Sequence, residues 1–351
     1  MAATIKPSYD TKRRRLAEIV PLKGPFTIFI EPTRCCNFKC FFCMHATRGN
    51  PDGVLAKSGY EMKHMDFEFY EKLLAQLAEF PEHPKRIVFS GLGEPLLNPR
   101  LPEMIARAKK MELAGRLDIL TNASLLTPEL TDALIAAGTT RIQVSLEGLD
   151  SAKYKEVTGV DVDFDKIYQN LGYLYKHKAN CSLFVKIIDS LVEAPGEKER
   201  FYKMFGPICD QMFIEHLITL QHPMGDHGGR ANNTRNLNNE EVIPRDICPV
   251  IFYLLEIDVD GNVFPCPISG LPKHFSMGNM NKNTLLEIWN SSRRKGLLRA
   301  QLMRKRSKLP VCCECHACSA VLDENENMDN DAERLLPLFF NNKRSAQCPP
   351  R

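Results

Sequence analysis

The sequence predicts an α/β protein built on a parallel sheet and followed by a smaller, cysteine-bearing region. Six short β-rich runs alternate with helical patterns between residues 25 and 219, as in proteins whose parallel strands are joined by helices. The alternation then stops, and the 13 cysteines of the chain include two tight groups, at 35–43 and 312–318. The alternation alone fits both an open sheet and a partial barrel.

The individual elements follow from local patterns. Thr127 marks a helix start, because a capping hydroxyl is followed by Pro128 in the first turn, and Gly138 follows the end. Two β runs around Asp260-Gly261 signal a hairpin over 253–267. The predicted strands are 25–31, 86–90, 116–122, 141–148, 182–189 and 211–219. The predicted helices are 66–80, 99–113, 127–138, 164–178, 196–208 and 284–302.

The length of 351 residues fits two domains. We expect a polar, basic arm over 1–24, a core over 25–220, a linker over 221–245 and a cysteine-bearing domain over 246–351. The stretch 221–241 is rich in Gly and Asn and has no periodicity. Its polar side chains, among them His222, His227 and Arg230, line a pocket or belong to a solvated linker, and both alternatives stay open.

Composition excludes several classes of protein. The charges of 46 Lys+Arg and 43 Asp+Glu nearly cancel, so there is no electrostatic reason to expect a nucleic-acid partner. The chain has no apolar run of about 18 residues and no signal-peptide core, so we expect a cytoplasmic protein without a membrane partner. Cytoplasmic proteins rarely hold cysteines as disulfides, and both cysteine groups are therefore interpreted as metal sites.

The first group has the spacing Cys36-x3-Cys40-x2-Cys43 and follows the first strand directly. These spacings let three thiolates converge on one face, at the strand end where ligands bind in parallel sheets. Structural zinc sites and iron-sulfur cubes usually take four ligands, so a cube held by three leaves one iron open to a substrate or cofactor. The alternative is a zinc site completed by Cys35 or by a distant cysteine.

The three cysteines, with Phe42 directly before the third, resemble the signature of the radical S-adenosylmethionine (SAM) superfamily. The segments GLGEPLLNP (91–99), TNAS (121–124) and VSLEG (144–148) end successive predicted strands and resemble further motifs of that family, although Leu92 stands where a glycine is frequent. The resemblance covers about residues 25–220 and implies a partial (β/α)6, TIM-like barrel.

The resemblance also implies the cofactors. The first three cysteines would bind a [4Fe-4S] cluster whose open iron is chelated by the amino and carboxylate groups of SAM. Residues implied around SAM are Phe42 at the adenine, Gly93 for close backbone approach, Glu94 beside the ammonium, Asn122 and Ser145 at the ribose or carboxylate, and Lys186 at the carboxylate. Each of three residues also has a structural alternative. The side chain of Asn122 hydrogen-bonds within a turn, that of Ser145 hydrogen-bonds at a strand end, and Lys186 is a solvated surface residue.

The second cysteine set resembles the SPASM or twitch extension that holds an auxiliary iron-sulfur cluster. Cys248, Gly261 and Cys266 give C-x12-G-x4-C around the expected hairpin, and Cys312-x2-Cys315-x2-Cys318 follows with Cys313 inside it. Two cubes with four protein ligands each need eight cysteines, and only seven stand from 248 onward. We therefore expect one auxiliary [4Fe-4S] cluster, held by Cys248, Cys266, Cys312 and Cys315, with Cys318 able to replace one of them. A zinc site remains the alternative.

These features predict an enzyme that reductively cleaves SAM and abstracts a substrate hydrogen, with a flavodoxin- or ferredoxin-type electron donor. The first hypothesis is dehydrogenation or epimerisation of a small polar molecule: a sugar, an aminocyclitol or a nucleoside. The second is maturation of a peptide or protein by crosslinking or by Ser or Cys oxidation, and the third is a non-catalytic scaffold. An epimerase needs a hydrogen donor, for which Cys181, Cys209 and Cys348 are candidates. The alternative for Cys181 and Cys209 is a small buried hydrophobe.

Overall fold

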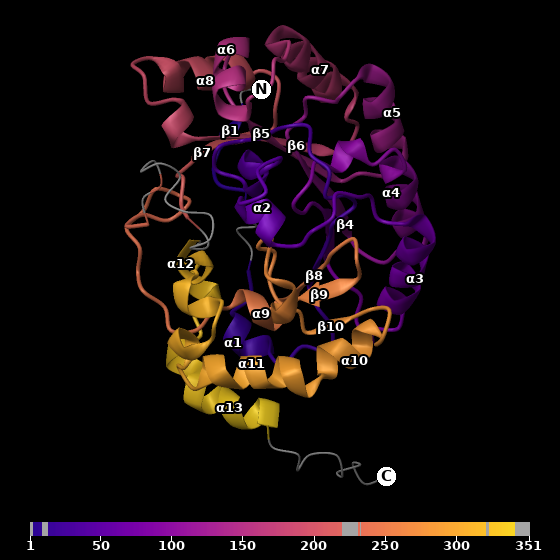
Figure 1. The fold of residues 1–351 in the computed structure, drawn as a ribbon, viewed down its shortest axis with the longest axis vertical. Coiled ribbons are helices and arrows are strands. Elements are labelled where there is room, and N and C mark those ends of the chain that lie inside the picture. Colours follow the sequence, from indigo (N-terminus) through magenta and orange to yellow (C-terminus); the bar gives the residue numbers. More distant parts are fainter. Residues whose placement is uncertain (1–2, 9–12, 220–230, 232, 321–322, 341–351) are drawn as a thin grey trace.

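The computed structural model describes residues 3–8, 13–219, 231, 233–320 and 323–340. Within these residues a ten-stranded, mostly parallel sheet runs in the order β1-β7-β6-β5-β4-β3-β2-β8-β9-β10 and does not close (Figure 1). The partial barrel with a C-terminal domain is thereby confirmed. The strands are β1 (Thr4–Ile5), β2 (Thr27–Ile30), β3 (Arg86–Phe89), β4 (Arg116–Thr121), β5 (Arg141–Leu146), β6 (Ser182–Ile188), β7 (Gln211–Glu215), β8 (Leu254–Ile257), β9 (Asn262–Phe264) and β10 (Gly278–Asn279).

Helices join the parallel strands in the predicted alternation. An unpredicted helix, α6, lies between β5 and β6: Asp150 caps it by accepting a hydrogen bond from Lys153 N, and Gly159 ends it with a φ of 70°. Its eight residues give too few turns for a clear apolar period. The core helices are α3 (Phe67–Ala78), α4 (Leu101–Lys110), α5 (Pro128–Ala136), α6 (Ser151–Thr158), α7 (Phe164–His177) and α8 (Glu197–Phe205).

Alternation along the strands separates an apolar face from a polar one. On β5, Ile142, Val144 and Leu146 belong to the main hydrophobic core. Because successive strand residues point to opposite faces, Ser145 and the following Glu147 lie on the other face of the sheet. The same alternation places Lys186 of β6 on that face together with the apolar Phe184, and the face that carries Ser145, Glu147 and Lys186 is called the polar face below.

The C-terminal region continues the core sheet directly. Strand β8 pairs in parallel with β2, from Thr27 opposite Leu254 to Ile30 opposite Ile257, and β9 returns antiparallel, as the hairpin signal predicted. The expected helix 284–302 is two helices, α10 (Leu285–Asn290) and α11 (Ser292–Leu302). The chain is extended at Ser291, whose side chain caps α11 by accepting from Arg294 N.

A second apolar cluster joins the N-terminal segment to the C-terminal helices. Leu16 of α1 (Leu16–Ile19) packs there with Ile251, with Leu298 of α11 and with Leu335 of α13 (Ala332–Phe340). Figure 1 shows these helices together at one end of the molecule.

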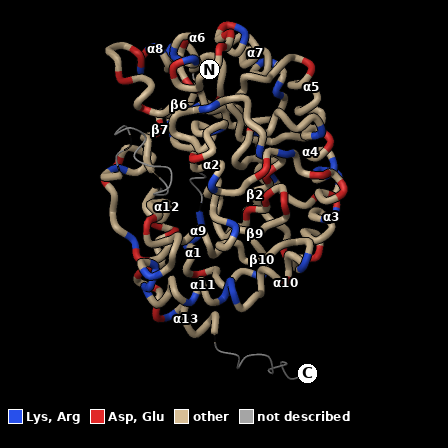
Figure 2. Tube along the Cα trace, in the orientation of Figure 1, with Lys and Arg blue, Asp and Glu red and all other residues tan. Residues whose placement is uncertain are grey.

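The charged residues are mixed in sign: Lys and Arg residues lie interspersed with Asp and Glu residues along the chain (Figure 2). Among the described residues, no helix is long and apolar enough to cross a membrane.

Candidate active site

The loop after β2 brings Cys36, Cys40 and Cys43 together. Their thiols interact electrostatically, and burial raises the pKa of all three, that of Cys36 to about 12. Neighbouring thiols raise the pKa of Cys36 and Cys40 further, because two thiolates side by side repel each other. A bound cation would counteract both effects and favour the thiolates, as at metal sites in general.

The backbone of the cysteine loop is fixed by the unpredicted helix α6. Lys39 N donates to Thr158 O at 3.0 Å, and Phe41 N donates to Val157 O at 3.1 Å. Arg48 donates from Nη1 to the carbonyl oxygen of Cys36 on the other side of the loop. The loop therefore holds its shape through main-chain contacts, independently of what the thiols bind.

Gly93 permits the GLGEP segment to lie directly on the cysteine loop. A Cβ at this position would stand 2.4 Å from the carbonyl oxygens of both Thr33 and Cys35. The contact is completed by Glu94 N, which donates to Cys35 O at 2.8 Å. Only glycine fits here, so the structure gives Gly93 a role against the cysteine loop, and its predicted close approach to SAM stays a prediction.

The carboxylate of Glu94 links the segment after β3 to the end of β4 through hydrogen bonds. It accepts hydrogen bonds from Thr121 Oγ1 at 2.6 Å, from Asn122 N at 2.8 Å and from Leu96 N at 3.0 Å. Burial raises the pKa of Glu94, and these donors pull it back in part. Its predicted contact with the SAM ammonium stays a prediction, and the structure adds a role in joining β3 to β4.

A polar cluster links the end of β4 to the cysteine loop. Asn122 Nδ2 donates to Asn37 Oδ1 at 3.1 Å, and Asn37 Nδ2 donates to Ser124 Oγ at 2.8 Å. Ser124 in turn donates from its backbone N and its Oγ to Asn122 Oδ1. Asn37 lies between Cys36 and Cys40, so it was visible in the sequence but was not singled out.

Ser145 and Lys186 stand opposite each other on β5 and β6, on the polar face. Lys186 Nζ forms an ion pair of 2.6 Å with Glu215 Oε2 at the end of β7. Glu147 was missed, although it lies in the VSLEG segment. Its Oε2 has no hydrogen-bond partner among the described residues, and burial raises its pKa to about 8 against the opposing effect of Lys186.

The second cysteine set also gathers at one place. Cys248 interacts electrostatically with Cys312, Cys315 and Cys318, and Cys266 interacts with Cys248, Cys312 and Cys315. Burial is the main cause that raises the pKa of Cys248 and Cys266. All five predicted candidates are therefore neighbours, and four or five thiols facing one space fit an iron-sulfur cluster.

The knot around Cys312 and Cys315 is held by Arg306, which donates from Nη1 to both carbonyl oxygens, at 2.7 and 3.0 Å. Cys313 is exposed and directs its thiol to Pro310 O. In the part of the chain that the structure describes, no three His, Cys, Asp or Glu side chains are spaced to hold one metal ion.

The remaining predicted residues lie in three different places. Phe42 is half-buried beside the cysteine loop and meets the ring of Phe41 edge to face at 5.1 Å. Cys181 and Cys209 are buried in the main core, just before β6 and β7, at the sheet edge opposite to the cysteine loop. The structure therefore does not bring them to the site. Cys348 lies outside the described residues.

Comparison with protein families gives two matches. Residues 30–193 match the model of the radical SAM superfamily, and residues 248–319 match SPASM, an iron-sulfur cluster-binding domain. The first match contains the cysteine loop and its three companion motifs. The second contains the five gathered cysteines of the C-terminal region.

Known proteins of similar sequence and structure cover most of the chain. A tungsten-containing aldehyde ferredoxin oxidoreductase cofactor-modifying protein of Pyrococcus furiosus is 25% identical over 82% of this chain and 86% of its own. The structure of BtrN in complex with AdoMet and 2-DOIA has a TM-score of 0.51 at 21% identity, covering 85% of this chain and 97% of BtrN. That of anSMEcpe with bound AdoMet and Cp18Cys peptide has a TM-score of 0.52 at 16% identity, covering 91% and 98%. At these identities the two structures establish the fold.

Proposed function

The chain belongs to the radical SAM superfamily and ends in a SPASM domain, and from this premise we propose that it oxidises or epimerises a small polar substrate. The substrate class is a sugar, an aminocyclitol or a nucleoside, and dehydrogenation is the reaction that the geometry supports best. Cys36, Cys40 and Cys43 would hold the SAM-binding [4Fe-4S] cluster. Cys248, Cys266, Cys312 and Cys315 would hold the auxiliary cluster, with Cys318 beside them.

The bound SAM and its cluster supply a one-electron cleavage of SAM to methionine and a 5′-deoxyadenosyl radical, which takes a hydrogen atom from the substrate. The protein would bind SAM and the substrate and orient them for this reaction. Lys186 offers a positive charge to the SAM carboxylate, and Asn122 and Ser145 offer hydrogen bonds on the polar face of the sheet. Gly93 lets the GLGEP backbone lie against the cysteine loop, and Phe42 offers a flat apolar surface.

One observation carries the preference for dehydrogenation: the parallel pairing of β8 with β2. Parallel strands end at the same edge of a sheet, so the turn between β8 and β9 lies beside the loop that holds Cys36, Cys40 and Cys43. Cys266 follows β9, which returns antiparallel to the other edge, and the chain then comes back to the loop, where Gly270 lies against Met44, next to Cys43. An electron acceptor held by this domain would therefore be close to a substrate at the loop, which supports net removal of two electrons and two hydrogens from it.

The proposal is tested with protein reconstituted anaerobically with iron and sulfide. The protein is incubated with SAM, dithionite and a panel of perdeuterated sugars, aminocyclitols and nucleosides, and in parallel with perdeuterated peptides. We expect deuterium in 5′-deoxyadenosine and a product that has lost two hydrogens, both measured by mass spectrometry. Deuterium transfer from peptides alone would replace the proposal with peptide maturation, and absence of SAM cleavage would leave the scaffold hypothesis.

A further inference from the structure

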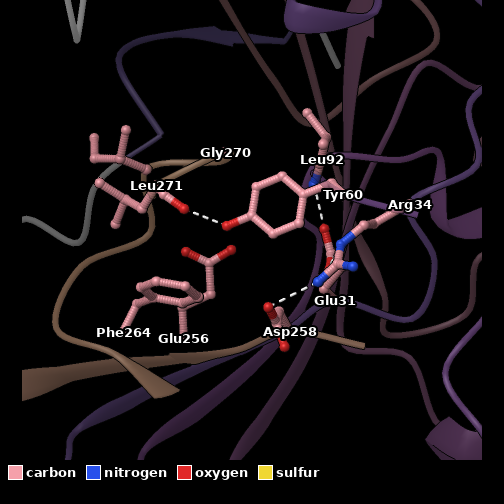
Figure 3. A pocket seen from close by; sticks show the side chains of 10 residues that line it. Glu31, Arg34, Tyr60, Leu92, Glu256, Asp258, Phe264, Gly270 and Leu271 are labelled. Atoms are coloured by element: carbon pink, nitrogen blue, oxygen red, sulfur yellow. Dashed lines mark hydrogen bonds and ion pairs between the residues drawn. The ribbon is translucent and has the colours of Figure 1, made fainter. Parts of the chain in front are cut away.

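A small polar cavity, with room for about one water-sized group, lies between the core sheet and the SPASM hairpin. It is formed where the end of β2 meets β8 and the segment after β9. Its lining includes Glu31, Arg34, Tyr60, Glu256, Asp258 and Phe264, none of which was predicted as a site residue (Figure 3). Leu92 of the GLGEP segment also lines it, so the cavity adjoins the proposed SAM site.

Most charges around the cavity are already paired. The guanidinium of Arg34, 1% exposed, contacts Glu31 Oε2 at 3.1 Å, Asp258 Oδ2 at 2.7 Å and Asp260 Oδ2 at 2.6 Å. Glu31 also accepts hydrogen bonds from Leu92 N at 3.0 Å and Val259 N at 3.2 Å. The guanidinium of Arg34 is therefore fully engaged in ion pairs with these carboxylates. Arg34 is also the one buried cation among the lining side chains.

Glu256 is the exception. It is 5% exposed, and its Oε2 has no hydrogen-bond partner among the described residues. Leu255 and Ile257 on either side belong to the main core, so alternation turns Glu256 to the other face, and Figure 3 shows its carboxylate in the cavity below the Tyr60 hydroxyl. A buried polar atom without a partner costs free energy, and its persistence is explained by a ligand that pairs with it.

The surroundings of Glu256 define that ligand. Burial raises the pKa of Glu256 well above its ordinary value, and the neighbouring Glu31 and Asp258 raise it further. Among the lining side chains, three carboxyl groups thus share the one guanidinium of Arg34. The ring of Phe264 forms an apolar wall, and the Tyr60 hydroxyl is held by the carbonyl oxygen of Leu271. A cation at Glu256 would relieve the repulsion among these carboxyl groups, and the aromatic walls suit an organic cation.

We propose that this cavity is the subsite for a protonated primary amine of a small substrate, with the Glu256 carboxylate as its ion-pair partner. The inference rests on the proposed function and narrows it, because it selects amine-bearing substrates from the class of small polar molecules. The cavity has room for the ammonium group alone, which is about the size of a water molecule, so the rest of the substrate would lie outside it. Cys266 lies two residues after Phe264, which puts the amine beside the auxiliary cluster.

The test uses the protein with both clusters in place and radiolabelled methylammonium as the probe, in anaerobic equilibrium dialysis. We expect one methylammonium per chain, and at least about tenfold weaker binding by Glu256→Gln, since the variant loses a hydrogen bond to a charged group. Gln has nearly the shape of a protonated Glu and should leave the fold intact. Glu61→Gln is the matched control. Glu61 is exposed beside Tyr60, and its substitution removes the same charge as Glu256→Gln.

Three results would overturn the inference: equal binding by wild type and Glu256→Gln, equal binding of neutral methanol by the wild type, or displacement of methylammonium by an equal concentration of potassium. The methanol and potassium measurements need no variant, so a folding defect does not affect them. Formation of 5′-deoxyadenosine from SAM is measured on the same preparations. Intact SAM cleavage without methylammonium binding contradicts this inference alone, whereas loss of SAM cleavage in the wild type contradicts the proposed function.

Discussion

Lys186 and Glu215 form an ion pair of 2.6 Å between the C-terminal halves of β6 and β7, on the polar face of the sheet. The pair holds a half-buried ammonium group opposite Ser145 before any ligand is bound. Lys186 is therefore neither a freely solvated lysine nor a charge that SAM must orient by itself. The cost of ordering its long side chain is met by the fold.

The first prediction follows from this pair. Lys186→Met should weaken SAM binding about ten- to hundredfold, because a hydrogen bond to a charged group contributes about 1.5–3 kcal/mol. Binding is measured by equilibrium dialysis with labelled SAM. Lys178→Met is the control, since Lys178 forms a similar pair with Asp210 before β6 and β7, at the far edge. Unchanged SAM affinity of Lys186→Met at unchanged iron content would make Lys186 structural.

The second prediction concerns Gly93. Gly93→Ala should empty the Cys36/Cys40/Cys43 site, because its Cβ would press on two carbonyl oxygens at 2.4 Å and push the loop aside. Iron should fall from about eight to about four per chain, as expected for loss of one of two [4Fe-4S] clusters. Gly172→Ala is the control, because a Cβ there meets nothing within 4 Å. Full iron content in Gly93→Ala would contradict the close approach.

The third prediction assigns the cluster that binds SAM. The triple change of Cys36, Cys40 and Cys43 to Ala should leave about four iron per chain and abolish SAM cleavage. SAM should alter the EPR spectrum of the wild type and leave that of the triple variant unchanged, because the auxiliary cluster has no open iron. A response of the triple variant to SAM would mean that the open iron belongs to the other site.

The fourth prediction separates the two clusters by function. Cys312→Ala combined with Cys315→Ala should keep 5′-deoxyadenosine formation under dithionite but lose the oxidised product, because in the proposed reaction the auxiliary site accepts the second electron. Both products are quantified by mass spectrometry. Circular dichroism and about four remaining iron per chain verify that the fold and the first cluster persist. Full product formation by a folded double variant would reduce the auxiliary site to a structural one.

The fifth prediction is a pH effect of Glu31. Burial raises the pKa of Glu31 to about 7, against the lowering effect of Arg34. The folded state therefore binds a proton that the unfolded state releases near the ordinary value of 4.5, so stability falls as pH rises toward about 7 and then levels off. Glu31→Gln should flatten this fall in the anaerobic thermal-unfolding midpoint.

The control for the pH effect is Glu103→Gln. Glu103 is exposed, and its hydrogen bond with Arg100 lowers its pKa, so it is ionised in both states over the same range. The variant should keep the wild-type dependence on pH. An unaltered dependence in Glu31→Gln would show that another buried acid is responsible.

The sequence by itself determined the strand order along the chain, the two cysteine groups and the three strand-end motifs that accompany the first group. The reason is local: alternation, caps and the spacing of Cys36, Cys40 and Cys43 are encoded within a few neighbouring residues. The sequence also determined the hairpin at Asp260-Gly261, because a turn of that type needs few residues. Helix α6 and the break between two helices at Ser291 were not predicted, since both depend on capping side chains within short helical segments.

Only the tertiary structure decided how these pieces meet. The pairing of β8 with β2 joins segments more than 220 residues apart, and no local pattern specifies which edge of a sheet a hairpin will extend. For Cys181 and Cys209 the sequence left open a hydrogen donor or a small buried hydrophobe, and the structure buries both at the edge opposite to the site. The partnerless Glu256 beside a fully engaged Arg34 likewise exists only through that pairing, because charges distant in sequence become neighbours when strands are brought together.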